Sequence, residues 1–251
     1  MYQERKYRYA MNPSRFTVFE ISYRETDVWI AVDTESFQKD MVASAEIFIR
    51  RLRYEVDRYI GTHKEFAVSL TPLDVRKNSP ECARRMVVAA AYADVGPMAA
   101  VAGAFADAIA RFLVENFSVQ EVIVENGGDC AIQITNPLQC SVYAGNTCLS
   151  EALAVNLDIP GYYGVCTSSG TVGHSFSFGH ADAVMIVCND AATADAYATA
   201  FANKVVSEDD VATIIDTISQ KHDILSSVVI CGEKVGVCGQ FPIYPCVKEV
   251  V

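Results

Sequence analysis

A run of short strand-like segments in the second half of the chain constrains the fold most. Between residues 121 and 187, brief apolar stretches are separated by glycine, proline, asparagine and serine, a pattern typical of strands joined by turns. The predicted strands are Val122–Val124, Cys130–Thr135, Cys140–Tyr143, Leu153–Leu157, Val165–Ser168 and Ala183–Val187. Strands that follow one another without helices between them argue against strict β-α-β alternation. The pattern therefore indicates a mixed α+β fold.

Helical patterns flank these strands. From Ser36 to Ile60, apolar residues recur three or four positions apart and form one stripe opposite a charged face. Further helices are predicted at Pro80–Ala93, Met98–Phe117, Thr193–Val205 and Glu208–Lys221, the last behind Ser207 as its N-cap. A break at Gly96-Pro97 separates the second helix from the third.

The remaining segments complete the expected layout. A hairpin is predicted from Phe16–Tyr23 and Val28–Asp33, a short strand at Phe66–Leu70, and a closing hairpin from Val228–Cys231 and Lys234–Cys238. Linker-like, low-complexity and like-charge tracts are absent from the sequence, so residues 1–251 are expected to form a single domain.

Composition limits the classes of partner. The net charge of −11 disfavours a nucleic-acid partner, because such a partner requires a basic surface. Met1–Ala10 lacks an apolar signal core, and no run of about 18 uninterrupted apolar residues predicts a membrane span. We therefore expect a soluble, cytoplasmic protein with no membrane partner.

The nine cysteines do not suggest a metal site. They are scattered and form no C-x-x-C pair, so a zinc or iron–sulfur centre built from close pairs is poorly supported. Most lie in apolar, strand-like surroundings, where a thiol behaves as a small hydrophobic group. Reduced and mostly buried thiols are the expectation.

A glycine-rich turn is the first candidate for chemistry. Gly127, Gly128 and Asp129 lie between two predicted strands. Paired glycines permit positive φ and let backbone N–H groups approach a ligand, while Asp129 offers a carboxylate to ribose or base donors. The same residues also suit a plain hairpin turn, and spacing alone favours that simpler interpretation.

A loop rich in hydroxyl groups is the second candidate. Its potential contacts to ligand oxygens are Ser168, Ser169, Gly170, Thr171, Gly173 and Ser175. Such a loop suits a backbone nest for phosphate, although no lysine follows the final glycine as a P-loop requires. His174 is a candidate catalytic residue that moves a proton, or else a hydrogen-bonded structural histidine.

Asp195 and Thr199 form the third candidate. They lie four residues apart in a predicted helix, so they share one face, where their oxygens could hold a hard cation such as Mg²⁺. Asp195 is thereby both a predicted metal ligand and a predicted catalytic group. The alternative is that its charge only favours the helix N-terminus. The small residues from Met98 to Ala106 likewise fit either tight packing or close approach of a flat ligand.

In this order and spacing, the three candidates resemble the ApbE family, flavin transferases that use FAD to attach FMN to a protein threonine. The resemblance is closer to a compact ApbE-like family. It is strongest over residues 96–205 and is carried by Val95–Ala104, Val124–Asp129, Thr167–Ser177, and Ala181–Ala183 followed by Ala194–Thr199 and Asn203.

The resemblance implies an ApbE-like α+β fold with mixed, mostly antiparallel sheets packed with helices and a nucleotide cleft between the layers. It further implies FAD or FMN as ligand, Mg²⁺ on Asp195 and Thr199, the turn at Gly127–Asp129 near the nucleotide, and a protein acceptor. Two features depart from the transferases. Ala102 stands where they carry lysine, and residues 174–179 replace their His-Ile-x-Asp-Pro segment.

Three functions fit these residues. The first is a Mg²⁺-dependent enzyme that transfers a flavin or nucleotidyl phosphate. The second is a non-flavinylating accessory protein of sulfide assimilation and homocysteine synthesis in an anaerobe, an association that the compact family carries. The third is an interaction module that keeps only the fold. The sequence identifies neither a protein acceptor nor whether the chain forms a homo-oligomer.

Overall fold

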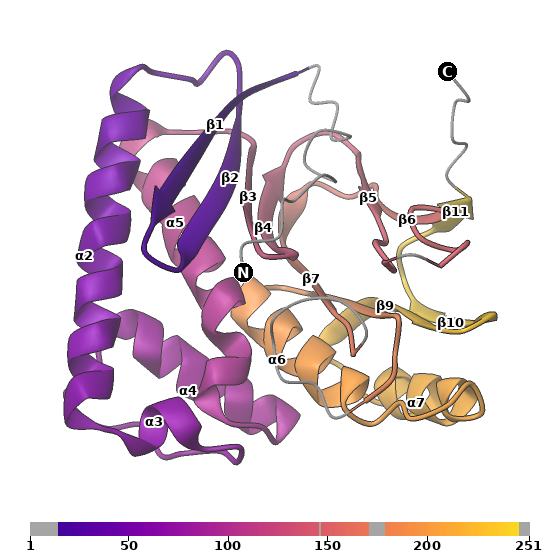
Figure 1. The fold of residues 1–251 in the computed structure, drawn as a ribbon. Coiled ribbons are helices and arrows are strands. Elements are labelled where there is room, and N and C mark those ends of the chain that lie inside the picture. Colours follow the sequence, from indigo (N-terminus) through magenta and orange to yellow (C-terminus); the bar gives the residue numbers. More distant parts are fainter. Residues whose placement is uncertain (1–14, 146, 171–178, 246–251) are drawn as a thin grey trace.

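An eight-stranded antiparallel sheet separates the molecule into two layers (Figure 1). The computed structural model describes residues 15–145, 147–170 and 179–245. Within these residues the strand order is β1-β2-β3-β4-β7-β8-β9-β10, and each strand is antiparallel to its neighbour. The bounds are Phe16–Tyr23 (β1), Thr26–Asp33 (β2), Val122–Asn126 (β3), Asp129–Ile134 (β4), Gly161–Ser168 (β7), Ala183–Cys188 (β8), Ile224–Cys231 (β9) and Lys234–Gly239 (β10). The predicted α+β class and its antiparallel sheet are confirmed.

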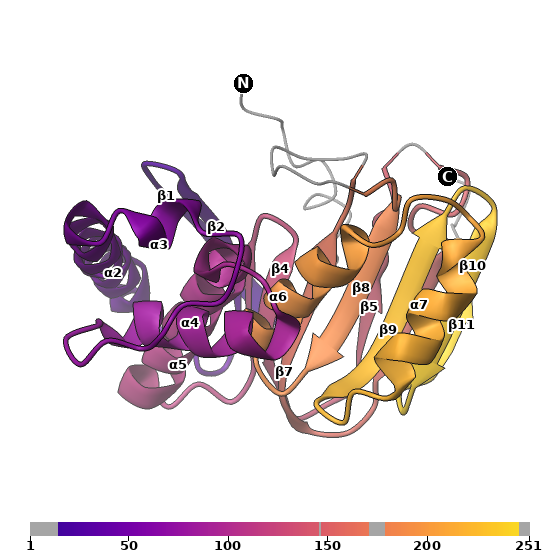
Figure 2. The same cartoon turned by 90° about the horizontal axis from the view of Figure 1, so that it is seen from below.

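Helices cover one face of this sheet. They are Asp40–Thr62 (α2), Glu65–Val68 (α3), Glu81–Ala93 (α4), Val101–Phe117 (α5), Ala191–Ala202 (α6) and Asp210–Ser219 (α7), with a 3₁₀ turn, Pro97–Ala100 (η1), before α5. Figures 1 and 2 show α4, α5 and α6 packed side by side, with α2 on the outer side of α5.

A smaller sheet covers the opposite face, in the order β11-β6-β5. Its strands are Leu138–Ser141 (β5), Leu153–Leu157 (β6) and Ile243–Pro245 (β11). Strand β8 lies between both layers and is buried along its whole length. Because side chains alternate along a strand, Val184 and Ile186 pack toward the helices, whereas Met185 and Val187 pack toward the small sheet. A strand covered on both faces therefore reads as a continuous apolar run.

One predicted strand is wrong. Phe66–Leu70 contains the short helix α3 followed by a loop. Only Phe66 is buried there, with its ring edge-on to Tyr59 at a centroid distance of 5.2 Å. Val68 and Leu70 are 75% and 71% exposed, so the apolar letters that suggested a strand do not share a buried face.

Several helix boundaries differ by a few residues from those predicted. The long first helix begins at Asp40 rather than Ser36, and α6 begins at Ala191 rather than Thr193. Ser207 is not an N-cap, because α7 begins after Asp209. The Ser207 N–H and hydroxyl instead donate to the side chain of Asp210. The N-cap position is Asp209, whose side chain makes no capping hydrogen bond.

Helix α5 is unusually apolar. The stretch Pro97–Phe117 is long and apolar enough to cross a membrane, with a mean hydropathy of 1.5. Within the described residues, 56% of its most apolar window is buried inside the protein. Its position between α2, α6 and the sheet accounts for this composition.

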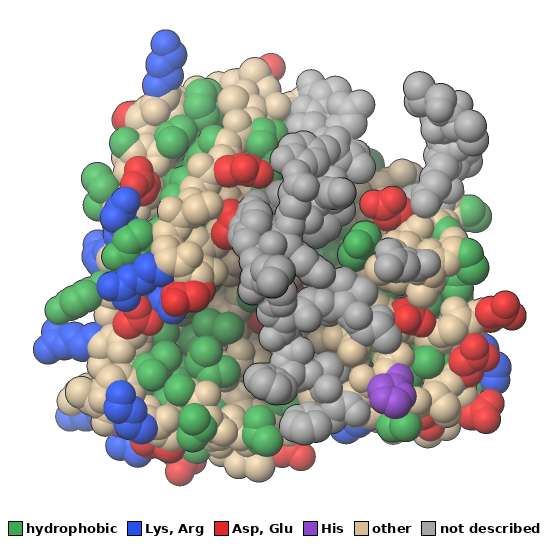
Figure 3. All heavy atoms as spheres, in the orientation of Figure 1, with side chains coloured by type: hydrophobic (Ala, Val, Ile, Leu, Met, Phe, Trp, Pro, Cys, Tyr) green, Lys and Arg blue, Asp and Glu red, His purple; other side chains and the backbone are tan. Residues whose placement is uncertain are grey.

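Basic side chains on the face shown in Figure 3 gather mainly over α2 at one edge of the molecule. Several of them are paired with carboxylates. Arg24 and Arg53 both contact Asp57, and Arg50 contacts Glu46. These ion pairs neutralise much of the local positive charge on that edge.

Candidate functional site

Helices α5 and α6 exchange capping carboxylates. Asp107 lies on α5, and its two oxygens accept the N–H groups of Ala191 and Ala192, each at 3.0 Å. These are the first two residues of α6, whose N–H groups have no partner within the helix. Asp107 has no exposed surface. The start of α6 is thus fixed by a buried charge from its neighbour.

Asp195 makes the reciprocal contact. It lies on α6, and its Oδ2 accepts the Gly103 N–H at 2.9 Å, while the N–H of Ala102 also donates to this carboxylate. Both donors belong to the first turn of α5. The simpler alternative, that Asp195 favours the start of its own helix, is corrected. That end of α6 is capped by Asp190, which accepts the Thr193 N–H at 2.8 Å.

Close packing makes this exchange feasible. A Cβ on Gly103 would lie 2.2 Å from the Ala191 carbonyl oxygen. No side chain fits in that space, so glycine lets the two helices approach until each carboxylate reaches the other helix. Gly103 therefore serves tight packing against α6.

Burial perturbs both carboxylates. It raises the pKa of Asp195 to about 7, although the N–H groups of Gly103 and Ala102 oppose the shift. Burial, followed by the charge of Asp190, raises the pKa of Asp107. Desolvation disfavours a carboxylate charge that no cation balances. Asp195 is thus a buried acid whose charged form a bound cation would favour.

Thr199 follows Asp195 by one helical turn, about 6 Å along the axis. It is half-buried in α6. A carboxylate has about four lone-pair positions, so Asp195 retains acceptor capacity beyond its two N–H partners. Among the described residues no cluster of three or more His, Cys, Asp and Glu side chains could hold a metal. Mg²⁺ usually takes few protein ligands and keeps several waters, so two protein oxygens would be enough for such a cation.

The glycine turn connects β3 to β4, as its sequence predicted. Gly127 and Gly128 have φ values of 74° and 103°, and the Gly128 N–H donates to Glu125 Oε1 at 2.7 Å. The Asn126 side chain donates to the Ala102 carbonyl oxygen at 3.1 Å. This last bond ties the turn to the start of α5, and so to the residues that contact Asp195.

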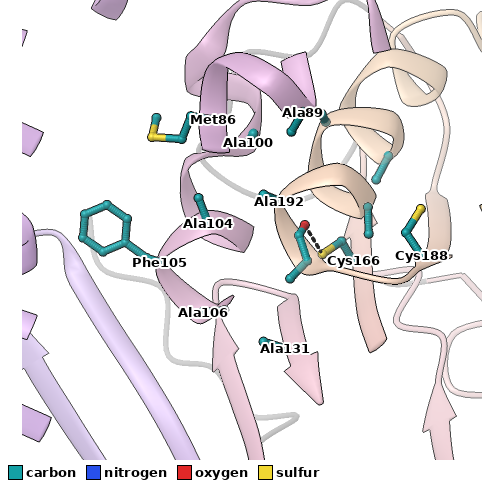
Figure 4. Close-up of a cluster of buried hydrophobic side chains, with 14 of the residues drawn as sticks. Met86, Ala89, Ala100, Ala104, Phe105, Ala106, Ala131, Cys166, Cys188 and Ala192 are labelled. Carbon is teal, nitrogen blue, oxygen red and sulfur yellow. Dashed lines mark hydrogen bonds between the residues drawn. The ribbon is translucent and has the colours of Figure 1, made fainter. Parts of the chain in front are cut away.

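Cys166 lies where the turn, α5 and α6 converge. It pairs with Asp129 across β4 and β7, so both side chains lie on the helix-covered face. Its thiol donates to the Ala191 carbonyl oxygen at 3.3 Å, the contact drawn as a dashed line in Figure 4. Burial raises the pKa of Cys166 well above its ordinary value, and the charges of Asp129 and Asp195 add to the shift. The fold therefore brings two of the three predicted groups of site residues together.

The serine-rich loop is described only in part. Ser168 ends β7, and beyond it the Gly170 N–H donates to the Ala181 carbonyl oxygen at 2.8 Å. The Ser169 hydroxyl also contacts that oxygen, at 3.4 Å. A Cβ on Gly128 would lie 3.6 Å from the Thr167 carbonyl oxygen, which places the glycine turn beside the end of β7.

The rest of this loop lies outside the described residues. This applies to four predicted site residues: Thr171, Gly173, His174 and Ser175. Their roles stay predictions.

Two hollows lie elsewhere on the described surface. One of about 370 Å³ lies between α4 and the start of α6, where Arg84, Tyr92 and Thr193 contribute to its wall. The other, of about 160 Å³, is lined by residues that include Tyr59 and His63. Neither is lined by the glycine turn or by Asp195, so neither corresponds to the expected nucleotide cleft.

Asp107 was not among the residues predicted from the sequence. Its signal was available: a single acidic residue within the apolar stretch from Val101 to Ala110 of a predicted helix. A charged residue that is fully buried needs polar partners, and these come from residues far away in the sequence. Tyr162, whose hydroxyl donates to Asp107 at 2.8 Å, was missed for the same reason.

Comparison with known sequences gives a consistent set of relatives. The profile of the AbpE bacteria family (AbpE_bact) matches residues 8–231. The chain is 38% identical over 229 residues to a UPF0280 protein of Methanocaldococcus jannaschii, covering 88% of this chain and 90% of that protein. It is 40% identical over 209 residues to a UPF0280 protein of Methanococcus vannielii, covering 82% of each.

Comparison with solved structures supports the fold. The ApbE protein of Thermotoga maritima superposes with a TM-score of 0.61 at 14% identity, covering 89% of this chain and 97% of that one. The apo form of the flavinyl transferase ApbE of Pseudomonas stutzeri gives a TM-score of 0.50 at 13% identity, covering 91% and 96%. At this level of identity the likeness concerns the arrangement of helices and strands.

Proposed function

The chain belongs to the AbpE bacteria family and is a relative of the UPF0280 proteins, and from this we propose that it binds a flavin nucleotide, FAD or FMN, together with Mg²⁺. The binding place is the junction of the β3–β4 turn, the start of α5 and helix α6. The Pseudomonas stutzeri protein of the same fold is named a flavinyl transferase.

The buried carboxylate of Asp195 is the observation that carries the proposal. It lies one helical turn before Thr199, and the charge of Asp107 adds to its raised pKa. Asp129, Asp195 and Asp107 all lie close enough to act on one thiol, that of Cys166. Asp195 and Thr199 would hold the cation through their oxygens. A bound divalent cation would neutralise negative charge on the phosphate oxygens of the ligand.

The neighbouring backbone suits a phosphorylated ligand. Gly127 and Gly128 present a turn without side chains, and Asp129 follows it directly. Ser168, Ser169 and Gly170 come from the adjacent end of β7. The Ser168 hydroxyl there would orient ligand oxygens, and Asp129 would accept hydrogen bonds from ribose or base, whereas the N–H groups of Gly128 and Gly170 already donate within the protein.

The reaction that fits this ligand is transfer of a flavin phosphate. In the proposed reaction, an acceptor threonine hydroxyl attacks the FMN phosphorus of FAD and forms a phosphoester. The bond to the AMP oxygen breaks, AMP leaves, and the hydroxyl proton passes to a base. His174 is the proposed base. Ala102, where the transferases carry lysine, marks the position at which this chain would differ from them in handling the substrate.

Direct binding tests the proposal first. Mn²⁺ binding would be followed by the loss of the free-ion electron paramagnetic resonance signal, and FAD binding by quenching of flavin fluorescence with and without Mg²⁺. Asp195→Asn and Thr199→Val should each weaken Mn²⁺ binding at least tenfold. Asp223→Asn is the matched control, because Asp223 contacts the same helix through the Tyr197 hydroxyl, which lies on another side of α6.

Turnover is the second test. Incubation with FAD, Mg²⁺ and a threonine-containing acceptor protein should release AMP in amounts equal to the flavin attached. Wild-type protein that binds neither Mn²⁺ nor FAD would overturn the proposal. Binding without AMP release from any acceptor would remove the transferase reaction and leave nucleotide binding.

The sulfur-assimilation alternative receives less support. A thiol that performs chemistry must ionise and be accessible. Cys166, which lies nearest the site, is fully buried, and its pKa is raised well above the ordinary value. This observation favours the flavin proposal over one in which a cysteine of the site reacts.

A further inference from the structure

The first turn of α6 is held from several sides at once. Asp107 accepts two of its N–H groups, and the Cys166 thiol donates to the Ala191 carbonyl oxygen. Two glycines let the neighbouring backbones approach this turn. A Cβ on Gly103 would lie 2.2 Å from the Ala191 oxygen, and one on Gly164 would lie 2.2 Å from the Asp190 oxygen. Any residue larger than glycine at position 103 or 164 would collide with the backbone at the start of α6.

Asp107 is itself held by a second residue. The Tyr162 hydroxyl donates to Asp107 Oδ1 at 2.8 Å, and the Arg111 guanidinium lies over the Tyr162 ring at 4.6 Å from its centroid. Asp107 thus receives three hydrogen bonds in a position with no exposed surface. Since buried carboxylates need such partners, its orientation is fixed.

This arrangement acts on the proposed cation ligands through the helix. Asp195 lies four residues after Ala191, and Thr199 lies another four residues further along α6. Mg²⁺ demands ligand oxygens in near-octahedral positions at about 2.0–2.1 Å. A tilt or shift of the first turn would displace both oxygens.

We propose that Asp107 is a positioning residue, which sets the place of α6 and thereby aligns Asp195 and Thr199 for a divalent cation. Tyr162 supports it by fixing its carboxylate. The inference rests on the proposed cation site, and it adds a residue that contacts neither cation nor nucleotide. Partners that orient metal ligands typically contribute about 10–100-fold to metal affinity.

Asp107→Asn tests this with a matched control. The variant keeps the side-chain volume but removes the charge and one acceptor. Glu121→Gln is the control, because Glu121 is also buried and also accepts two consecutive N–H groups, those of Thr135 and Asn136. Glu121 lies at the opposite end of β3 from the glycine turn. Mn²⁺ affinity should fall at least tenfold in Asp107→Asn and stay within twofold in the control, at a temperature where both remain folded.

Amide hydrogen exchange supplies a readout that needs no metal. Exchange over residues 191–199 should be accelerated at least tenfold more than exchange over α7 in Asp107→Asn, whereas in Glu121→Gln the two segments should change by the same factor. Tyr162→Phe removes one donor and should show a smaller change in the same residues. It serves as the test variant if Asp107→Asn does not fold.

The outcomes separate the two proposals. Wild-type Mn²⁺ affinity in Asp107→Asn, or unchanged exchange over residues 191–199, would overturn the positioning role. If wild-type protein binds no Mn²⁺, the cation site fails and the alignment for a cation fails with it, while faster exchange over residues 191–199 would still assign Asp107 to holding α6.

Discussion

Asp107 and Asp195 each cap the helix that carries the other. The Asp107 side chain on α5 accepts the first two N–H groups of α6, and the Asp195 side chain on α6 accepts the Gly103 N–H of α5. Both carboxylates are buried, and burial raises both pKa values. Helix α6, which bears Asp195 and Thr199, is therefore joined to α5 by two buried carboxylates.

Replacing Asp195 by asparagine should stabilise the metal-free protein at pH 8. Burial raises the pKa of Asp195 to about 7 from an ordinary value of 3.8. A raised carboxylate pKa contributes stability that is present below the unfolded-state value and is lost as pH rises through about 7. Removal of the charge should then raise the melting temperature by roughly 2–4 °C for each kcal/mol recovered, with a larger rise at pH 8 than at pH 5.

The same variant should lose Mn²⁺ binding. A gain in stability together with a loss of binding is typical of a residue kept for function rather than for the fold. Differential scanning calorimetry at both pH values gives the first quantity. A lower melting temperature at pH 8 would contradict the assignment of Asp195 as an uncompensated buried charge.

Gly103→Ala should destabilise the protein by about 1–3 kcal/mol, as overpacking does in closely packed cores. The new methyl group would lie 2.2 Å from the Ala191 carbonyl oxygen and would force α5 and α6 apart. Gly61→Ala is the control, because Gly61 also lies in a helix and has no atom within 4 Å of the added Cβ. That change should be neutral or stabilise by up to about 1 kcal/mol. Urea unfolding of both variants compares them, and equal effects would refute the packing argument.

Glu121→Gln should reduce stability at neutral pH by about 1–3 kcal/mol. Burial pushes the pKa of Glu121 up, but the N–H groups of Asn136 and Thr135 and the charge of Arg15 outweigh it, so the pKa is lowered overall. The stability from this carboxylate is present above pH 4.5 and is lost as pH falls through its folded-state value. Wild type and variant should therefore converge in acid. Urea unfolding at pH 7 and pH 3.5 checks this, and a constant difference at both would disprove it.

Among the described cysteines, Cys148 should react first with a thiol reagent. It is exposed, whereas Cys82 and Cys166 are buried. Burial raises the pKa of Cys82 to about 12, which leaves almost no thiolate at neutral pH. Iodoacetamide labelling followed by peptide mass mapping should show Cys82 and Cys166 modified only after unfolding. Modification of Cys166 in the folded protein would show that its thiol is accessible and would support a reactive cysteine at the site.

Local patterns predicted most elements because their signals are short-range. The hairpin of β1 and β2 follows from alternation in Phe16–Tyr23 and its partner, and α4 from apolar spacing in Pro80–Ala93. Phe66–Leu70 failed because five apolar-rich residues suit a strand or a helical turn equally. Only the burial of Phe66 against Tyr59 decided between them.

By itself, the sequence determined the α+β layout, the glycine turn and the shared helical face of Asp195 and Thr199. These features depend on periodicity and on residues a few positions apart, so they are visible in the sequence alone. The tertiary structure decided that Asp195 faces the start of α5, that Cys166 lies beneath the first turn of α6, and that Asp107 holds that turn. Such contacts join residues 25 to 92 positions apart. A buried carboxylate can reach its partners only where the neighbouring backbones pack closely. Glycine at positions 103 and 164 permits this close approach, and no local sequence pattern predicts it.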